Sequence, residues 1–308
     1  MDLRQLQAFL AVVEHGGFTA AARATHTVQS SISTHVARLE RELEATLIDR
    51  STGRPTEEGE AVLTRARRIQ TELASLQADV SSLRGSPRGT VRLGIIGTTA
   101  RWLTPILVET LAVESPDIQL VVTDGTTRSL ELRLLDGELD VGLVSLPVED
   151  PEIRTTALFD EDHVVVGPND HPLAKIEGAV DLAELAKHKL MLAAPGTPFR
   201  QEIDETFRAK GLRVQAKLEV DGLRLLASLA FQGFGVAIVP ATAAPGWIGG
   251  PWTRIQVEGL SRRTVGLAAR RRGMPTVAAQ ATVEVLRKVV ATHAPEVQGL
   301  HVASGVTQ

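Results

Sequence analysis

Residues 18–43 read FTAAARATHTVQSSISTHVARLEREL, and they decide how the front of this chain folds. The alanine-rich run 19–24 predicts one short helix, and a second helix is predicted to begin near Gln29 after a tight joint. In the second helix, apolar residues recur at steps of four, three and four, which predicts one buried stripe along the helix. That stripe consists of Ile32, Val36, Leu39 and Leu43.

The outward face of the second helix carries short polar side chains and, from Gln29 to Leu39, no acid. Its members are Gln29, Ser30, Ser31, Ser33, Thr34, His35 and Arg38. Such a helix can enter the major groove of DNA, and its N-terminal amides can meet phosphates there. This is the geometry of a helix-turn-helix, in which the second helix reads DNA. The alternative is an ordinary helical bundle with solvated hydroxyls, and this stretch alone does not separate the two.

The segments on either side fit a DNA-binding domain. Residues 3–13 have apolar residues at steps of three, four and three, which predicts an amphipathic helix, ended by the glycine pair at 16–17. After the second helix of the pair, Gly53 and Pro55 mark a turn. This turn carries Arg50 and Arg54, where a wing would touch phosphates or the minor groove. A plain loop with solvated arginines is the alternative.

A long helix is predicted from Thr56, a plausible N-cap, to a hinge at 85–89 rich in glycine and proline. Its apolar residues step by four and three through three full repeats. They are Val62, Ala66, Ile69, Leu73, Leu76, Val80 and Leu83. A single helix gains little from so narrow a stripe, so we interpret it as a dimerisation helix. Packing against its own chain is the less favoured alternative.

From Thr90 onward the pattern changes to alternating strands and helices, which predicts parallel sheets with right-handed crossovers. Among these elements we expect an apolar helix from about Leu103 to Val113 and a strand at 164–167. Ligands of such sheets lie beyond the carboxyl ends of strands, at helix N-termini. The loops expected there carry Gly97, Thr98, Thr99, Thr127, Ser145, Thr197 and Phe199. Hydroxyls and backbone amides suit an anion or a small carboxylate held between two lobes. Each threonine alone is more commonly a helix cap.

Composition excludes several other classes of protein. With 308 residues, 43% of them hydrophobic, the chain has room for two domains and a sizeable core. The net charge is -4, so any contact with DNA depends on the local placement of charge. Cysteine is absent, which fits a reducing cytosol. The first residues do not have the pattern of a signal peptide, and no apolar stretch has the length of a membrane helix, so we expect neither.

Motifs for catalysis and for metal binding are also missing. The sequence has no nucleophile elbow, zinc-protease helix or phosphate loop. The acids Asp160, Glu161 and Asp162 are interpreted as solvated turn residues, and the histidines show no metal spacing. We therefore expect no enzyme activity and no cofactor.

Five segments together resemble the LysR-type transcriptional regulators, and the likeness covers nearly the whole chain. They are LRQLQAFLAVVEHGGFTAAAR at 3–23, QSSISTHVARLERELEATL at 29–47, TEEGE at 56–60, GELDVG at 137–142 and GFGVAIVP at 233–240. The resemblance implies a winged helix-turn-helix, a dimerising linker helix and a two-lobed effector-binding domain like periplasmic binding proteins. It also implies homotetramers in many members and contact with RNA polymerase during activation. Members that sense peroxide use cysteines, and this chain has none.

Carried onto this chain, the resemblance assigns DNA contacts and effector contacts to particular residues. The recognition positions are Gln29, Ser30, Ser31, Ser33, Thr34 and Arg38, with Arg50 and Arg54 in the wing. The effector positions are Thr98, Thr99, Thr127, Ser145, Thr197 and Phe199. The partners expected are double-stranded operator DNA, a small effector for which an anion is the first candidate, and further copies of the chain.

We therefore expect an α+β chain of two domains. The expected division is a winged helix-turn-helix over 1–58, a linker helix and hinge over 59–89, an effector-binding domain over 90–294 and a flexible tail over 295–308. Lobe I takes about 90–163 plus 264–294, and lobe II about 164–263. The expected function is regulation of transcription in the bacterial cytoplasm under control of a small molecule. The rivals are a ligand-independent architectural DNA-binding protein and, less favoured, a two-lobed solute-binding protein or enzyme.

Overall fold

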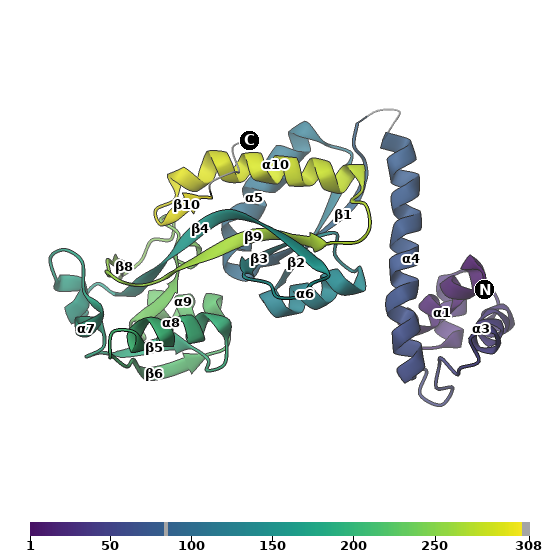
Figure 1. Ribbon diagram of the computed structural model, residues 1–308, viewed down its shortest axis with the longest axis horizontal. Helices are drawn as coiled ribbons and strands as arrows, with labels where there is room; N and C mark the ends of the chain where they lie inside the picture. The colour runs from purple at the N-terminus through teal and green to yellow at the C-terminus, as the bar shows by residue number, and fades with distance from the viewer. Residues whose placement is uncertain (83–85, 304–308) are drawn as a thin grey trace.

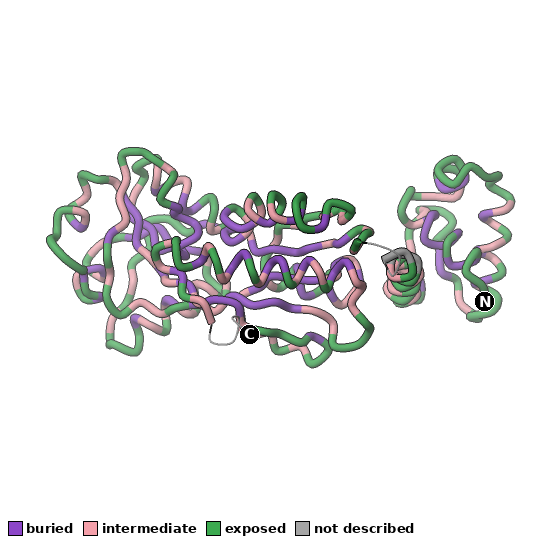
Figure 2. The backbone as a smooth tube through the Cα atoms, turned by 90° about the horizontal axis from the view of Figure 1, so that it is seen from above, coloured by how far each residue is buried: buried purple, intermediate pink, exposed green. Residues whose placement is uncertain are grey.

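The computed structural model describes residues 1–82 and 86–303. Three short helices form one end of the molecule, the long helix α4 stands beside them, and a larger α/β domain lies beyond it (Figure 1). Buried residues gather along the strands of the large domain and between the short helices, whereas α4 is mostly exposed or half-buried (Figure 2). The chain therefore has two separate cores joined by one helix.

The N-terminal helices pack around one hydrophobic core. They are α1 (Leu3–His15), α2 (Phe18–Ala24) and α3 (Gln29–Leu43). Asp2 and Gln5 form a capping box at the start of α1, and Gly16 ends it in the left-handed conformation with φ 72°. Phe9, Val36 and Leu39 are fully buried in the shared core. The predicted helix pair is thus held by the apolar stripe of α3.

Helix α4 (Glu57–Ser82) begins where the Thr56 hydroxyl accepts a hydrogen bond from the Gly59 amide at 3.0 Å. Only its first turns belong to the N-terminal core, through Leu63 and Ala66. Beyond them the helix runs past the large domain, making contacts with α6 and α10. Leu83, the last position of the predicted heptad pattern, lies outside the described residues.

Lobe I is a mixed sheet covered by helices. Strands β1 (Gly89–Ile96), β2 (Ile118–Gly125) and β3 (Val141–Leu146) are parallel, and β9 (Arg262–Arg270) pairs antiparallel to β3. The helices are α5 (Gly97–Glu114), α6 (Thr127–Asp136) and α10 (Val277–His293), and the last returns from the C-terminal part of the chain (Figure 1). Leu93, Leu103 and Phe159 are fully buried in its core.

Lobe II has a smaller sheet. Strand β5 (Lys189–Ala193) pairs in parallel with both β6 (Gln215–Val220) and β7 (Ala237–Pro240). The remaining elements are η1 (Pro172–Lys175), α7 (Leu182–Leu185), α8 (Pro198–Arg208), α9 (Leu223–Phe231), η2 (Ala241–Ala243) and β8 (Trp252–Ile255). Ile203 and Phe207 of α8 are buried against the strands.

The two lobes share one long strand, β4 (Ile153–Pro168). Its first part pairs antiparallel with β9 in lobe I, and its last part pairs with β7 and β8 in lobe II. The sequence prediction placed a strand only at 164–167, so this expectation was too short. Two polar runs, at 154–156 and 160–162, flank the short apolar segment 157–159 and hide the strand. Such residues fit a strand here because it crosses between lobes and pairs on both sides.

Two further expectations were wrong. Helix α5 begins at Gly97 and not near Leu103, so Thr98 and Thr99 lie in its first turn and not in a loop. Both are buried, and packing outweighs the weak helix propensity of threonine. The C-terminal residues from 295 to 303 are also not a loose tail, because η3 (Ala294–Glu296) is followed by β10 (Leu300–Val302), which pairs antiparallel with β4. Residues 304–308 lie outside the described residues.

Candidate DNA-binding surface and effector site

From Gln29 to Leu39, the exposed side of α3 presents a polar surface free of acids, which we call the recognition face. Its predicted members are Gln29, Ser30, Thr34 and Arg38, which are exposed, and Ser31 and Ser33, which are half-buried. The helix starts after Val28 with no side-chain cap, and the Ser31 amide already donates to the Val28 carbonyl at 3.0 Å, so the amides of Gln29 and Ser30 keep their donors for another partner. The face therefore combines free backbone donors, hydroxyls and one guanidinium.

The stripe beneath this face ends one turn earlier than expected. Ile32, Val36 and Leu39 are buried, but Leu43 is 39% exposed, so its predicted place in the core is wrong. Leu43 is the last residue of α3, and Glu44 follows in the left-handed conformation with φ 52°. The chain therefore turns away from the core before Leu43 can reach it.

The turn after α3 places its two arginines in different settings. Ile48 and Pro55 form an antiparallel bridge that closes the turn. Arg50 donates to Glu40 at 3.2 Å and lies over the ring of Phe18, 5.3 Å from its centroid. Arg54 is exposed, and no described residue pairs with its guanidinium. The predicted wing therefore has one tethered and one free arginine.

Glu40 is a residue that the sequence patterns did not single out. Its carboxylate accepts from the Leu47 amide at 2.9 Å and the Ile48 amide at 3.3 Å, besides pairing with Arg50. It thereby fixes the turn against the end of α3. The only signal in the sequence is that Glu40 is the first acid after a long acid-free run.

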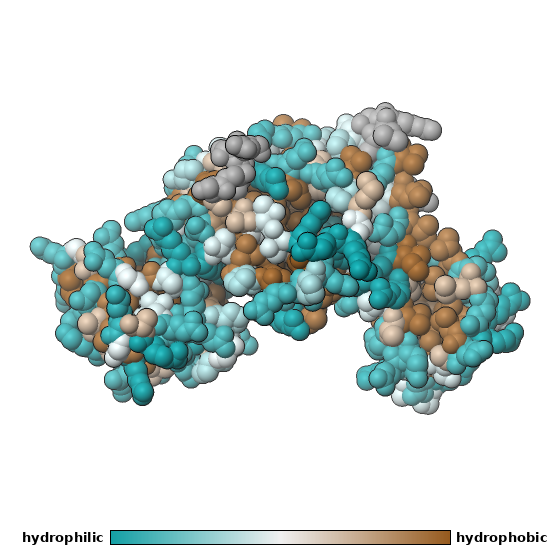
Figure 3. All heavy atoms as spheres, in the orientation of Figure 1, coloured by the Kyte–Doolittle hydropathy of each residue, from teal (hydrophilic) through white to brown (hydrophobic). Residues whose placement is uncertain are grey.

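The apolar stripe of α4 divides into a covered part and an open part. Val62 and Ala66 pack on the N-terminal core. Farther along, Ile69 is 37%, Leu76 is 61% and Val80 is 50% exposed. Hydrophobic side chains gather along α4 and continue onto the N-terminal helices in the space-filling view (Figure 3). The second half of the stripe is thus available for a partner helix.

In the effector-binding domain, the predicted residue Thr98 belongs to a buried polar cluster at the point where the paired strands β4 and β9 reach the boundary between the lobes, which we call the crossing cluster. Arg263 of β9 donates to Glu161 of β4 at 2.7 Å and to the Thr98 hydroxyl at 2.7 Å. Glu161 also accepts from the backbone amide of Thr242 in η2 at 2.6 Å. All four residues are buried. The cluster therefore ties α5 of lobe I to η2 of lobe II through the shared strand.

The expectation that Glu161 is a solvated turn residue was wrong. Glu161 is fully buried on β4, although its neighbours along the strand face outward or toward the edge. A buried carboxylate persists because a guanidinium and an amide satisfy it. No local pattern could reveal this, since its partner Arg263 lies 102 residues away along the chain.

Several polar atoms next to the crossing cluster are buried and have no hydrogen-bond partner among the described residues. They are Thr99 Oγ1, Thr242 Oγ1 and His163 Nε2. The Nδ1 atom of His163 lies 3.2 Å from the Ser261 hydroxyl, and its ring packs edge-on against Phe199 at 4.8 Å. Burial, assisted by the positive charge of Arg263, lowers the pKa of His163 to about 3. The histidine is therefore neutral at physiological pH.

The other predicted effector residues lie in both lobes. Thr127, in the first turn of α6, accepts a hydrogen bond from the Ser145 amide at 3.1 Å, so these two are directly joined. Thr197 caps α8 by accepting from the Arg200 amide at 3.3 Å. The ring of Phe199 packs against His163, and the described contacts do not join Phe199 to Thr98, Thr99 or Thr127 of lobe I. The structure thus joins Thr127 with Ser145 and connects Thr98 to the crossing, while Thr197 serves as a cap.

Arg224 and Asp124, which the sequence patterns did not single out, form an ion pair between the lobes. Arg224 lies in the first turn of α9 in lobe II, and Asp124 lies on β2 in lobe I. The pair lies over Gly97, where an added Cβ would come within 2.7 Å of the Asp124 carboxylate. Gly97 therefore lets a charged pair approach the N-terminus of α5.

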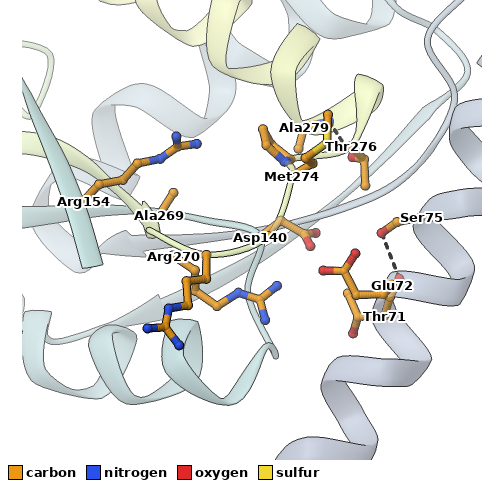
Figure 4. A pocket seen from close by; sticks show the side chains of 13 residues that line it. Thr71, Glu72, Ser75, Asp140, Arg154, Ala269, Arg270, Met274, Thr276 and Ala279 are labelled. Atoms are coloured by element: carbon orange, nitrogen blue, oxygen red, sulfur yellow. Dashed lines mark hydrogen bonds between the residues drawn. The ribbon is translucent and has the colours of Figure 1, made fainter. Parts of the chain in front are cut away.

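Two hollows lie elsewhere, at the junction of α4 with the effector-binding domain. One is a groove of about 680 Å³ lined by α4 and by residues from 274 to 280. The other is a small cavity of about 30 Å³, where Glu72 of α4 faces Asp140 and Arg270 of the sheet (Figure 4). Burial raises the pKa of Asp140, whose carboxylate accepts from the Arg92 amide at 2.7 Å.

The described residues contain neither a candidate membrane span nor a cluster of metal ligands. Among residues 1–82 and 86–303, no helix combines the length and apolarity required to span a bilayer. Within the same ranges, no three His, Cys, Asp or Glu side chains gather as a metal site would need.

Comparison with known protein families matches both parts of the chain. Residues 3–60 match the bacterial regulatory helix-turn-helix protein, lysR family, and residues 84–291 match the LysR substrate binding domain. A probable hydrogen peroxide-inducible genes activator of Streptomyces viridosporus is 34% identical over 245 residues, which cover 79% of this chain and 78% of the relative. The nitrogen assimilation regulatory protein nac of Klebsiella aerogenes is 29% identical, with 99% of this chain and 100% of the relative covered.

Solved structures of full-length regulators have the same architecture. A full-length OxyR variant from Pseudomonas aeruginosa superposes with a TM-score of 0.72 and 25% identity, over 95% of each chain. Full-length CbnR in complex with its target DNA superposes with a TM-score of 0.70 and 26% identity, covering 94% of this chain and 100% of that one.

Proposed function

The chain belongs to the LysR family of bacterial transcriptional regulators, and from that premise we propose that its recognition face reads operator DNA while a small molecule between the two lobes controls the outcome. The observation that carries this proposal is the acid-free polar side of α3, set on a core that leaves it exposed. Its serine, threonine and glutamine side chains are of a size to reach base edges in the major groove.

On DNA, we assign different roles to the residues of this surface. Gln29, Ser33 and Arg38 are proposed to contact bases or adjacent phosphates, and the free amides at the start of α3 are proposed to bind a phosphate. Arg54 is the wing residue best placed to meet the backbone, because no described residue pairs with it. Arg50 contributes less, since Glu40 already neutralises it.

For the effector, we propose a site bounded by the first turns of α5 and α6 in lobe I and by the start of α8 in lobe II. Thr98, Thr99 and Thr127 would supply hydroxyls from one side, and Phe199 would supply an apolar wall from the other. Ser145 and Thr197 would act mainly by holding these turns, as their hydrogen bonds indicate. An anion remains the first candidate, with the uncapped N-terminus of α5 as its receptor.

The cations near this site limit how an anion could be held. Arg263 is already bound to Glu161, and Arg200 is bound to Asp204 and Glu219. The exposed Arg224 is paired with Asp124 across the two lobes and can exchange its partner at small cost. We propose that an effector carboxylate competes with Asp124 for Arg224. Because the chain has no cysteine, thiol oxidation is not its signal, even though a relative is named for induction by peroxide.

We also propose that the chain works as a homodimer through α4 and assembles further into a homotetramer, that it acts in the cytoplasm, and that it contacts RNA polymerase when it activates. The open stripe of Ile69, Leu76 and Val80 supports the dimer, since a period of 3.5 residues indicates a helical partner. Paired recognition faces would then meet paired half-sites on DNA.

The test is a DNase I footprint of the purified full chain on the DNA upstream of its own gene. We expect a protected region with two half-sites, weakened by Ser33→Ala but not by Glu60→Ala on the exposed side of α4. A chain that protects no specific sequence at moderate salt would overturn the proposal. A thermal-shift screen of small carboxylates then tests the effector site, with Thr99→Val as the variant that should lose any stabilisation found.

A further inference from the structure

One side of α4 contacts the effector-binding domain of the same chain, and we call its four polar residues the linker brace: Thr64, Arg68, Thr71 and Asp79. The contacts join Thr64 Oγ1 to Asp136 Oδ1 at 3.4 Å, Arg68 Nη2 to Leu135 O, Thr71 Oγ1 to Gly137 O at 3.4 Å, and Asp79 Oδ1 to Val277 N at 2.8 Å. Beside the brace, Arg67 pairs with Glu138 at 2.8 Å.

The charges of the brace match the two helix ends that they touch. Arg68 lies at the C-terminal end of α6, where unpaired carbonyls and the helix dipole favour a cation. Asp79 lies at the N-terminal end of α10, where free amides favour an anion. The two residues are separated by roughly 16 Å along α4. The brace is therefore a two-point contact of matched sign, spread over three turns of helix.

The brace leaves the apolar stripe of α4 free. Taking 100° per residue, the brace lies roughly 140° around the helix from the stripe. Ile69, Leu76 and Val80 are 37%, 61% and 50% exposed while the brace is engaged. They line one groove together with Met274, which is 84% exposed, and with the brace residues Arg68 and Asp79. The polar side of α4 thus contacts its own effector-binding domain, and the exposed part of the stripe beside it is available to a second copy.

The helix held by the brace also reaches the proposed effector site. Helix α6 spans ten residues, or roughly 15 Å. Its first residue, Thr127, binds the Ser145 amide, and its last carbonyls receive Arg68 and Thr71. Gly137 at its end packs closely, because an added Cβ would lie 3.0 Å from Arg68 and 3.1 Å from Arg270. A displacement of α6 along its axis would therefore move the carbonyls that Arg68 and Thr71 of α4 contact.

From these contacts, we propose that the linker brace is a binding surface for the chain's own effector-binding domain and sets the angle between that domain and the recognition faces. We further propose that α6 passes a displacement at Thr127 to α4, and this second part rests on the function proposed above. The physical basis is a rigid helix whose two ends contact the two sites.

Because the chain has no cysteine, the contact can be tested by one designed disulfide. We expect the full chain with Thr64→Cys and Asp136→Cys to form a disulfide within one chain after oxidation. On a denaturing gel without reductant, this variant should then migrate at the mass of a monomer. The matched control is Arg65→Cys with Asp136→Cys, since Arg65 is exposed and turned about 100° away. No cross-link, or a cross-link at dimer mass, would overturn the brace as a contact within one chain.

The coupling is tested by removing the brace charges with Arg68→Ala and Asp79→Ala together. The control is Glu60→Ala with Arg65→Ala, which removes the same charges from exposed positions of α4. We expect the brace variant to change operator affinity on the order of fivefold or more and to alter the footprint length, while the control matches the unaltered chain. Equal footprints and affinities in both variants would overturn the coupling. If even the unaltered chain binds no operator, the proposed function is wrong. The cross-linking experiment still tests whether α4 contacts the effector-binding domain of its own chain.

Discussion

The recognition face of α3 and the crossing cluster both gather polar side chains, but in opposite surroundings. On α3, Gln29, Thr34 and Arg38 face water, so the Gln29 amide, the lone pairs of the Thr34 hydroxyl and the Arg38 guanidinium can meet another molecule. At the crossing, Glu161 and Arg263 are shielded from water, so they satisfy each other. Substitutions on α3 should therefore change what the chain binds, whereas substitutions at the crossing should change whether it stays folded.

The largest effect is expected at Glu161. Glu161→Gln leaves the Arg263 charge buried without its counter-ion and should lower the free energy of unfolding by about 3–5 kcal/mol, measured by urea denaturation. Arg262→Ala, which breaks an exposed pair with Asp162, should cost under about 1 kcal/mol. If the two variants unfold at similar urea concentrations, the contrast between buried and exposed polar groups is wrong.

Next comes the effect of pH on the buried His163. Its pKa is lowered to about 3 in the folded chain, so only the unfolded chain takes up this proton below about pH 6.5. The contribution of neutral His163 to the free energy of unfolding is therefore complete above pH 6.5. Below that pH, the free energy of unfolding should fall by about 1.4 kcal/mol per pH unit toward pH 5. Burial raises the pKa of the nearby Glu202, which opposes the loss at lower pH. His163→Gln should flatten the profile, whereas His15→Gln, on the exposed end of α1, should not.

A third prediction concerns the recognition face itself. Arg38→Ala should weaken operator binding by about 1–3 kcal/mol in a titration by electrophoretic mobility shift, because one base or phosphate contact is lost. Its free energy of unfolding should change by less than about 0.5 kcal/mol. Arg41→Ala, on the last turn of the same helix, provides the control. A loss of stability equal to the loss of binding would assign Arg38 to the core and not to DNA.

The smallest effect is expected at Thr127, whose hydroxyl is hydrogen-bonded within the chain like the crossing cluster, but which is only half-buried. Thr127→Val removes the acceptor of the Ser145 amide and should cost about 1 kcal/mol of unfolding free energy. Thr123→Val on β2 has no described side-chain hydrogen bond and should be near neutral. Equal melting temperatures for both variants would show that the Ser145 amide finds another acceptor.

Local periodicity was sufficient to predict the elements whose cores are built from neighbours in sequence. The steps of Ile32, Val36 and Leu39 predict α3, and those of Val62 and Ala66 predict the start of α4. The full length of β4 could not be predicted in this way, because polar runs at 154–156 and 160–162 interrupt its apolar pattern and the pairing partners of these residues lie on β9. Leu43 was assigned to the core because periodicity does not indicate where a helix stops.

The candidate sites differ in the same way: some depend on local periodicity, and others depend on contacts between residues distant in sequence. Exposure of the α3 face follows from the helical period alone, so its residues could be chosen from the sequence. Glu161, Arg263 and the Arg224–Asp124 pair depend on residues about a hundred positions apart meeting in space. A pattern read along one chain carries no information about such meetings, which is why Glu161 was taken for a surface acid.

The pairing of β10 with β4 has a consequence for how the chain tolerates shortening. His301 and Val302 cover the edge of β4 beside Asp160 and Phe159, next to the buried carboxylate of Glu161. A chain cut after 294 would leave that edge with unpaired amides and carbonyls, a ready template for joining the strand of another molecule. Fusions at the C-terminus should therefore follow the last residue, and trimmed versions should be expected to aggregate on storage.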